Sequence, residues 1–151
     1  MIITFFGHGS FKNSADYSRT VLEILECRIG DNEAEIYLGG YGYFDNFAYE
    51  CCKKYKLYHP RVRLVYVTPY INESYQKNHL KEAYSNYDLI LYPPIEEKPP
   101  KFAIKYRNRY MVEKADFVIF YIEHKWGGAY QAYLHAIRNK KEILNLSNRI
   151  I

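Results

Sequence analysis

The chain has 151 residues, of which 48% are hydrophobic and 25% are charged, a composition typical of one soluble globular domain. Its net charge of +4 permits an anionic ligand without requiring nucleic acid. No apolar run approaches the ~20 residues that cross a bilayer, and the N-terminal segment lacks the basic region of a signal peptide. We therefore expect a cytoplasmic protein.

The three cysteines, Cys27, Cys51 and Cys52, have neither zinc-site spacing nor a CxxC pair. We expect them to be reduced, buried thiols. No second His or Cys stands where it would complete a metal site, and no complete dinucleotide or P-loop fingerprint occurs. The sequence therefore predicts neither a metal nor a cofactor.

Apolar runs and turn residues alternate along the whole chain. In chain order they predict a strand at 2–6, a helix at 17–29, a strand at 34–38, a helix at 44–55, a strand at 61–67, a helix at 74–84, a strand at 88–92, a helix at 101–114, a strand at 116–122, a helix at 129–138 and a strand at 142–146. Ser14 or Asp16 can cap the first helix.

Strands that alternate with helices are typical of a parallel sheet with right-handed crossovers. The continuous apolar run at 116–122 suits a strand covered on both faces. We therefore predict an α/β fold: a single Rossmann-like, three-layer α/β/α domain over residues 1–151. Its sheet is expected to be mostly parallel, with five to six strands.

Glycines follow three of the predicted strands. Because the carboxyl ends of parallel strands meet at one edge, we expect these turns to converge on one crevice, where helix N-termini favour anions. The alternative is that each glycine only permits a tight turn. The glycines concerned are Gly7, Gly39, Gly40, Gly42, Gly127 and Gly128.

Polar residues beside these turns are further candidates. His8 and Ser10 follow the first strand, and a histidine there can bind phosphate or transfer a proton. Asp45 lies in the first turn of a helix. It either stabilises that turn through the helix dipole or accepts a hydrogen bond from a ribose hydroxyl. Thr68 ends the third strand and can supply a hydrogen bond. His8 and Ser10 can equally be inert loop residues.

Arg107 and Asn108 lie on the helix that precedes the strand at 116–122. An arginine fork matches phosphate geometry, so we expect Arg107 to hold a phosphate and Asn108 to add a hydrogen bond. The alternative is a solvated basic face, which Lys105 and Arg109 on the same helix also favour.

Taken together and in order, these motifs resemble the SLOG superfamily, which includes the Lonely Guy (LOG) phosphoribohydrolases and the DNA-processing protein DprA. The resemblance spans nearly the whole chain and is greatest to the small YpsA-like members. The segments that carry it are Gly7-His8-Gly9, Gly39-Gly40-Tyr41-Gly42 with Asp45 and Ala48, Thr68-Pro69, Arg107-Asn108 with Met111, Val112, Ala115 and Asp116, and Gly127-Gly128.

The resemblance implies a nucleotide or nucleotide-derived ligand at the strand ends and a homo-oligomer, a dimer or tetramer. LOG enzymes cleave a base from a nucleoside monophosphate with an arginine, which Arg107 matches, and a glutamate in a PGGxGTxxE turn. The corresponding turn here, Lys125 to Gln131, lacks that glutamate. Base cleavage needs a carboxylate to support the oxocarbenium ion, and Asp45, Glu50 and Glu123 are the alternatives.

Three functions follow. The first is binding of a nucleotide-like small molecule at the strand ends. The second is a nucleotide N-glycosidase or phosphoribohydrolase. The third is a single-stranded nucleic-acid-binding module, in which tyrosines stack on bases. The third ranks last because the positive charge is spread along the chain without a dense basic block. No membrane partner is expected.

Overall fold

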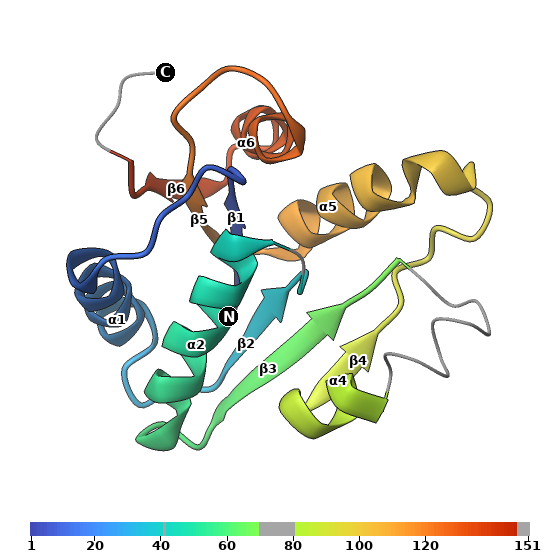
Figure 1. Cartoon of the computed structure of the whole chain (residues 1–151). Coiled ribbons are helices and arrows are strands. Elements are labelled where there is room, and N and C mark those ends of the chain that lie inside the picture. The colour runs from blue at the N-terminus through green and yellow to red at the C-terminus, as the bar shows by residue number, and fades with distance from the viewer. Residues whose placement is uncertain (41, 70–80, 148–151) are drawn as a thin grey trace.

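The computed structural model describes residues 1–40, 42–69 and 81–147. It forms a parallel sheet between two layers of helices (Figure 1). The elements in chain order are β1 (Ile2–Gly7), α1 (Ala15–Ile29), β2 (Ala34–Leu38), α2 (Tyr43–Leu57), β3 (Val62–Val67), α4 (Lys81–Asn86), β4 (Leu89–Leu91), η2 (Pro100–Phe102), α5 (Ala103–Lys114), β5 (Phe117–Tyr121), α6 (Gly128–Arg138) and β6 (Glu142–Asn145). The Rossmann-like α/β prediction is confirmed.

The strand order β4-β3-β2-β1-β5-β6 places β1 at the topological switch point of the sheet. The chain moves outward from β1 to β4 and then returns to the other side of β1 for β5 and β6. In β1, Ile3 is paired with Ile36 of β2 and with Phe117 of β5, both in parallel register. The turns that follow β1, β2 and β5 therefore meet at one edge.

Alternate residues of the central strands enter two separate cores. Ile3 and Phe5 pack beneath α1 and α2, whereas Phe6 packs beneath α5 and α6. All five residues of β5 are buried, because helices cover both faces of the sheet (Figure 1). This explains why β5 is a continuous apolar run.

Most predicted boundaries agree with the structure to within two residues. Ser14 is the N-cap of α1, where its hydroxyl accepts a hydrogen bond from the backbone N–H of Tyr17. Of the helix predicted at 74–84, only 81–84 lies within the described residues, and α4 covers it.

The prediction of three buried cysteines is wrong for Cys27, which faces solvent on α1, while Cys51 and Cys52 are buried. Within the described ranges, no helix has the length and apolarity needed to cross a membrane.

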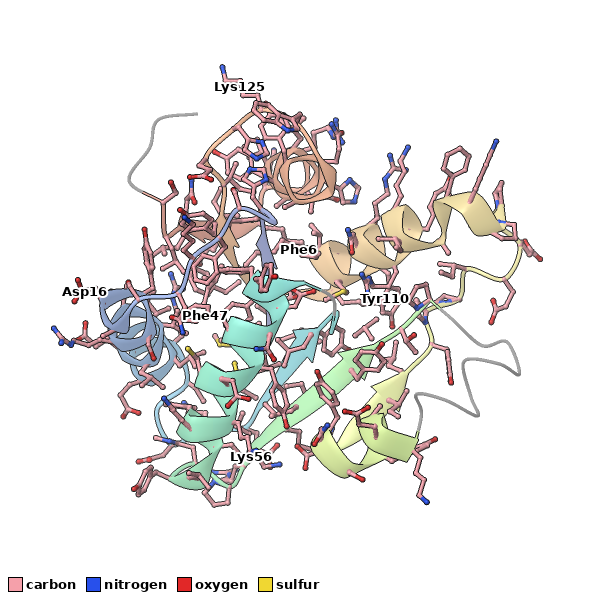
Figure 2. The ribbon with its side chains drawn as sticks, in the orientation of Figure 1. Phe6, Asp16, Phe47, Lys56, Tyr110 and Lys125 are labelled. Carbon is pink, nitrogen blue, oxygen red and sulfur yellow. The ribbon has the colours of Figure 1, made fainter. Side chains whose placement is uncertain are left out.

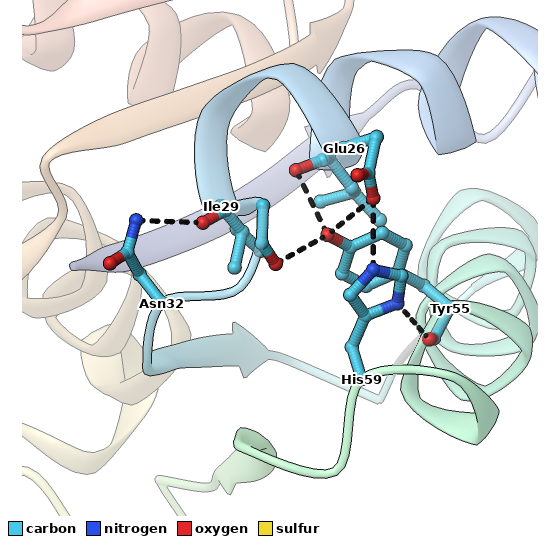
Figure 3. Close-up of polar contacts among 7 residues, drawn as sticks. Glu26, Ile29, Asn32, Tyr55 and His59 are labelled. Atoms are coloured by element: carbon cyan, nitrogen blue, oxygen red, sulfur yellow. Dashed lines mark hydrogen bonds and ion pairs between the residues drawn. The ribbon is translucent and has the colours of Figure 1, made fainter.

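A polar cluster joins the C-terminal ends of α1 and α2 (Figure 3). The buried hydroxyl of Tyr55 donates to Glu26 Oε2 at 3.1 Å, with the Gly30 carbonyl at 3.4 Å. The Tyr55 ring stacks on His59 with centroids 3.8 Å apart, and His59 Nε2 lies 2.9 Å from the same Glu26 oxygen. The cluster lies at the opposite end of α2 from the carboxyl edge of the sheet, so it stabilises the fold away from the candidate site.

We predict that Tyr55→Phe lowers the free energy of unfolding by about 1 kcal/mol at pH 7, since the ring stays packed while the hydroxyl loses its acceptors. Burial raises the pKa of Tyr55 above its ordinary value of 10.0, followed in importance by its hydrogen bond to Glu26. A raised pKa gives stability that is fully present below pH 10 and is lost as the pH rises further. The difference in the free energy of unfolding between wild type and variant should therefore become smaller above pH 10.

Urea unfolding at pH 7 and at pH 11 measures both effects. Tyr58→Phe is the matched control. Because Tyr58 is 84% exposed, loss of its hydroxyl should leave the free energy of unfolding unchanged at both pH values. This role for Tyr55 would be contradicted if wild type and Tyr55→Phe had equal free energies of unfolding at pH 7, or if their difference grew at alkaline pH.

Candidate functional site at the carboxyl edge of the sheet

Two helices begin at this edge with open glycine caps. Gly42 caps α2 with φ of 96° and Gly127 caps α6 with φ of 92°, a backbone region that favours glycine. Neither helix has a side-chain cap, and nothing lies within 4 Å of where a Cβ on Gly42, Gly127 or Gly128 would stand. The first backbone N–H groups of both helices are thus available to an anion.

The other predicted glycines are packed against side chains of the same chain. A Cβ on Gly7 would lie 2.3 Å from Cγ of Phe44, and one on Gly40 would lie 2.3 Å from Cε2 of Tyr66. Close packing within the protein therefore explains both glycines. A ligand role for Gly7 and Gly40 stays a prediction, and Tyr41 in the same turn lies outside the described residues.

Arg107 is only 5% exposed and ties together the ends of two strands. Its Nη1 donates to the carbonyls of Gly39 (3.1 Å), just after β2, and Val67 (2.9 Å), the last residue of β3. Its Nε donates to Asn108 Oδ1 at 2.9 Å. These hydrogen bonds occupy several donors of the guanidinium group that we expected to hold a phosphate. Phosphate binding by Arg107 stays a prediction.

Asp45 lies beside the same group. One of its carboxylate oxygens and the Arg107 Nη1 are 3.2 and 3.1 Å, respectively, from the position of a Cβ on Gly39. A carboxylate, a guanidinium and a glycine thus meet at the end of β2, where the carboxylate complements the buried cation. Thr68 is fully buried just beyond β3, and its backbone N–H donates to the Leu91 carbonyl.

His8 and Ser10 both contact the segment that follows β5. His8 is 4% exposed, and its ring stacks on His124 with centroids 3.4 Å apart. Ser10 donates a hydrogen bond to Glu123, and the Tyr121 hydroxyl donates to the same carboxylate at 3.3 Å. Burial, with Glu123 as the next cause, raises the pKa of Tyr121 to about 12.

The carboxylates considered for base cleavage lie in different surroundings. Asp45 faces Arg107 and Glu123 serves Ser10, as described above, whereas Glu50 is exposed and borders a cleft of about 550 Å³ between the β1–α1 loop and α2. A hydrolase activity that uses one of these carboxylates stays a prediction. In the described part of the chain, no three His, Cys, Asp or Glu side chains are grouped to hold a metal.

A second cleft of about 250 Å³ lies between α5 and α6, with mainly apolar walls. Cations from both helices border it, together with Asn108 and the first residue of α6. It is lined by Ile104, Lys105, Asn108, Arg109, Gly128, Gln131, Ala132 and Arg138. Because no carboxylate lines the cleft, an anion beside the open N-terminus of α6 would meet these cations and no like charge.

Cations and aromatic rings alternate from Lys98 into α5, forming what we call the basic strip: Lys98, Lys101, Phe102, Lys105, Tyr106 and Arg109. The ammonium groups of Lys101 and Lys105 lie 5.1 and 5.7 Å from the Phe102 ring centre. Lys98 and Arg109 lie 4.9 and 5.5 Å from that of Tyr106. Lys105 and Arg109 also line the second cleft, so the two features are continuous.

Positive charge is concentrated in this segment. Residues 98–112 contain five basic and no acidic side chains, which contradicts our expectation that the charge is evenly spread. In the sequence, this basic segment is marked by the absence of Asp and Glu from residues 98–112. Arg107 belongs to the segment but points inward, so the surface carries the other four cations.

No family model matches the sequence, and no curated protein matches it either. Two solved structures of DNA processing protein A (DprA) are similar in fold. That from Streptococcus pneumoniae has a TM-score of 0.66 at 16% identity, over 99% of this chain and 51% of that one. That from Helicobacter pylori, described with a single-stranded DNA binding mode, has a TM-score of 0.64 at 21% identity, over 99% and 66%.

The chain thus spans about half and about two thirds of the two DprA chains. At these identities the likeness shows the fold, which agrees with the SLOG resemblance of the sequence. A closer kinship with the YpsA-like members stays a prediction. The chain has the Rossmann-like fold that is found in DprA proteins.

Proposed function

We propose that this chain is a SLOG-type domain that binds single-stranded nucleic acid through the basic strip and the adjoining cleft between α5 and α6. The observation that carries the proposal is the run of four outward cations around two aromatic rings, with no carboxylate among them. This is the combination that single strands require, because the cations follow the phosphates and the rings stack on bases.

The shape of the surface supports a strand rather than a compact ligand. The basic strip follows η2 and the first half of α5, where this helix extends beyond the sheet (Figure 1). The cleft then leads to the open N-terminus of α6, and Arg138 adds a cation from that helix. A flexible chain of phosphates can contact all of these groups in succession.

The likeness to DprA adds support of a different kind. The Helicobacter pylori protein binds single-stranded DNA and shares this fold. Its function comes to this chain as a proposal, because the identity is low and the longer chain has parts without a counterpart here. A homo-oligomer, which the SLOG resemblance implies, and a cytoplasmic location, which the sequence pattern predicts, belong to the same proposal.

A second candidate, binding of a nucleotide-like small molecule at the strand ends, is favoured by one observation. Both α2 and α6 begin with glycine caps that leave their N-terminal N–H groups open at the same edge of the sheet. Such N-termini bind a phosphate through backbone donors and the helix dipole. A single nucleotide needs one of them, together with a sugar-binding group such as Asp45.

For the main proposal we predict that removing three cations, in Lys101→Ala/Lys105→Ala/Arg109→Ala, weakens binding to an oligo(dT) strand by about tenfold or more at moderate salt. Each lost phosphate contact lowers the slope of log K against log salt by about 0.7 for a single strand. The slope should therefore fall by about 2. Fluorescence anisotropy at several salt concentrations measures both quantities.

The matched control is Arg19→Ala/Lys53→Ala/Lys54→Ala, which removes the same charge from exposed positions on α1 and α2, on the other face of the sheet. Arg107 is left intact in both variants because its hydrogen bonds hold β2 and β3. Equal effects of the two triple variants, or no binding of any oligonucleotide by wild type, would overturn the proposal.

For the second candidate we predict opposite effects on stability and binding from Gly128→Glu. An acidic residue in the first turn stabilises a helix by up to about 1 kcal/mol, and the side chain enters open space. The same charge repels a phosphate from the α6 N-terminus, so a nucleotide that shifts the melting temperature of wild type should not shift that of the variant.

Gly128→Gln, which has nearly the same shape and no charge, separates charge from bulk and should keep most of the nucleotide-induced shift. A panel of nucleoside mono-, di- and triphosphates provides the ligands for this thermal-shift measurement. If no member of the panel stabilises wild type, the small-molecule function is excluded, while strand binding is tested separately by the anisotropy experiment.

A further inference from the structure

Three aromatic side chains form a stack that leads from the interior to the surface of the carboxyl edge. The ring of His8 lies parallel to that of His124, with centroids 3.4 Å apart and an interplanar angle of 25°. The His124 ring lies on that of Trp126, with centroids 3.7 Å apart and an angle of 18°. His8 is buried and Trp126 is 67% exposed, so the stack ends at the solvent.

The inner end of this stack is fixed by the sheet. The backbone N–H of His8 donates to the Tyr121 carbonyl, which extends the pairing of β1 with β5. Its Nε2 lies 3.2 Å from the His124 carbonyl oxygen and 3.4 Å from the His124 backbone nitrogen. Burial, and next the electrostatic effect of the neighbouring His124, lowers the pKa of His8, which favours the neutral form of the innermost ring.

His124 is held mainly by ring contacts. Its Nδ1 is buried and makes no hydrogen bond with the described residues, while the ring has His8 on one side and Trp126 on the other. Trp126 is therefore ordered by the rings beneath it. An aromatic ring that is already ordered loses less entropy on binding a partner than a freely rotating one does.

One face of Trp126 covers His124, and the exposure of the residue leaves the other face open. The next residues, Gly127 and Gly128, have nothing near the positions of their Cβ atoms and begin α6 without a side-chain cap. Lys125 precedes the ring and is directed away from the body of the protein (Figure 2). A flat apolar face thus adjoins a cation and open backbone donors.

This combination matches a nucleobase with its phosphate. The base requires a flat aromatic face, and the phosphate next to it requires a cation or a helix N-terminus. A purely apolar partner would need a patch of several hundred Å², whereas here one ring is surrounded by polar groups. Gly128 also lines the cleft that joins the basic strip, so a strand on the strip can continue to Trp126.

We propose that Trp126, supported by His124 and His8, is the base-stacking platform of this protein and that a base of a bound single strand covers its open face. The inference rests on the proposed function and deepens it by naming the residue that recognises bases. The basic strip then supplies contacts to phosphates, and Trp126 supplies a contact that an abasic strand cannot make.

Trp126 is the only tryptophan of the chain, so fluorescence excited at the long-wavelength edge of the tryptophan band, where tyrosine does not absorb, reports on this ring alone. We expect oligo(dT) to quench it on binding, and an abasic strand of equal length to bind more weakly without comparable quenching. Trp126→Ala should weaken oligo(dT) binding by about tenfold and leave the salt slope unchanged, because stacking releases no counterions. Trp126→Phe should retain most of the affinity.

His124→Ala provides a second variant, which removes the supporting ring and should weaken oligo(dT) binding less than Trp126→Ala does. Far-UV circular dichroism checks that each variant is folded. If oligo(dT) binds with the expected dependence on Lys101, Lys105 and Arg109 but neither quenches Trp126 nor loses affinity in Trp126→Ala, the platform is disproved and the strand-binding function stands. If no strand binds at all, both fail.

Discussion

The parallel pairing of β1 with β2 on one side and β5 on the other is the constraint on which the rest of this structure depends. It directs the turns after these strands to one edge of the sheet and sends the following helices to opposite faces. The open caps of α2 and α6, the Arg107 cluster and the His8 stack are all consequences of this pairing. Residues more than a hundred positions apart in sequence, such as His8 and His124, become neighbours through it.

Basic residues at this edge have two different physical roles. Arg107 is buried and satisfies the carbonyls of Gly39 and Val67, which the ladder leaves open where β2 and β3 end. A buried charge of this kind holds a structure in one arrangement, and its loss leaves unpaired acceptors behind. The cations of the basic strip are at the surface, where they contribute little to stability and remain available to phosphates.

The fold was predictable from the sequence because most strands are rich in apolar residues and turn residues separate them from the helices. The positions of the glycine turns were predictable from the sequence, but the contacts that require glycine there were not. Gly7 is required by the Phe44 ring and Gly40 by Tyr66, and contacts between residues so distant in sequence leave no local pattern. The inward direction of Arg107 was hidden for the same reason, since Lys105 and Arg109 on the same helix face outward.

The first half of α5 has a further consequence. The buried residues of this helix, Arg107, Met111 and Val112, all lie beyond its first turn, so core packing does little to hold that turn. Lys101, Lys105 and Arg109 follow one another at intervals of four residues, which brings like charges together on one face. The segment from η2 into α5 is therefore electrostatically frustrated when unliganded, and an anion bound along it would relieve the repulsion and slow the exchange of its amide hydrogens.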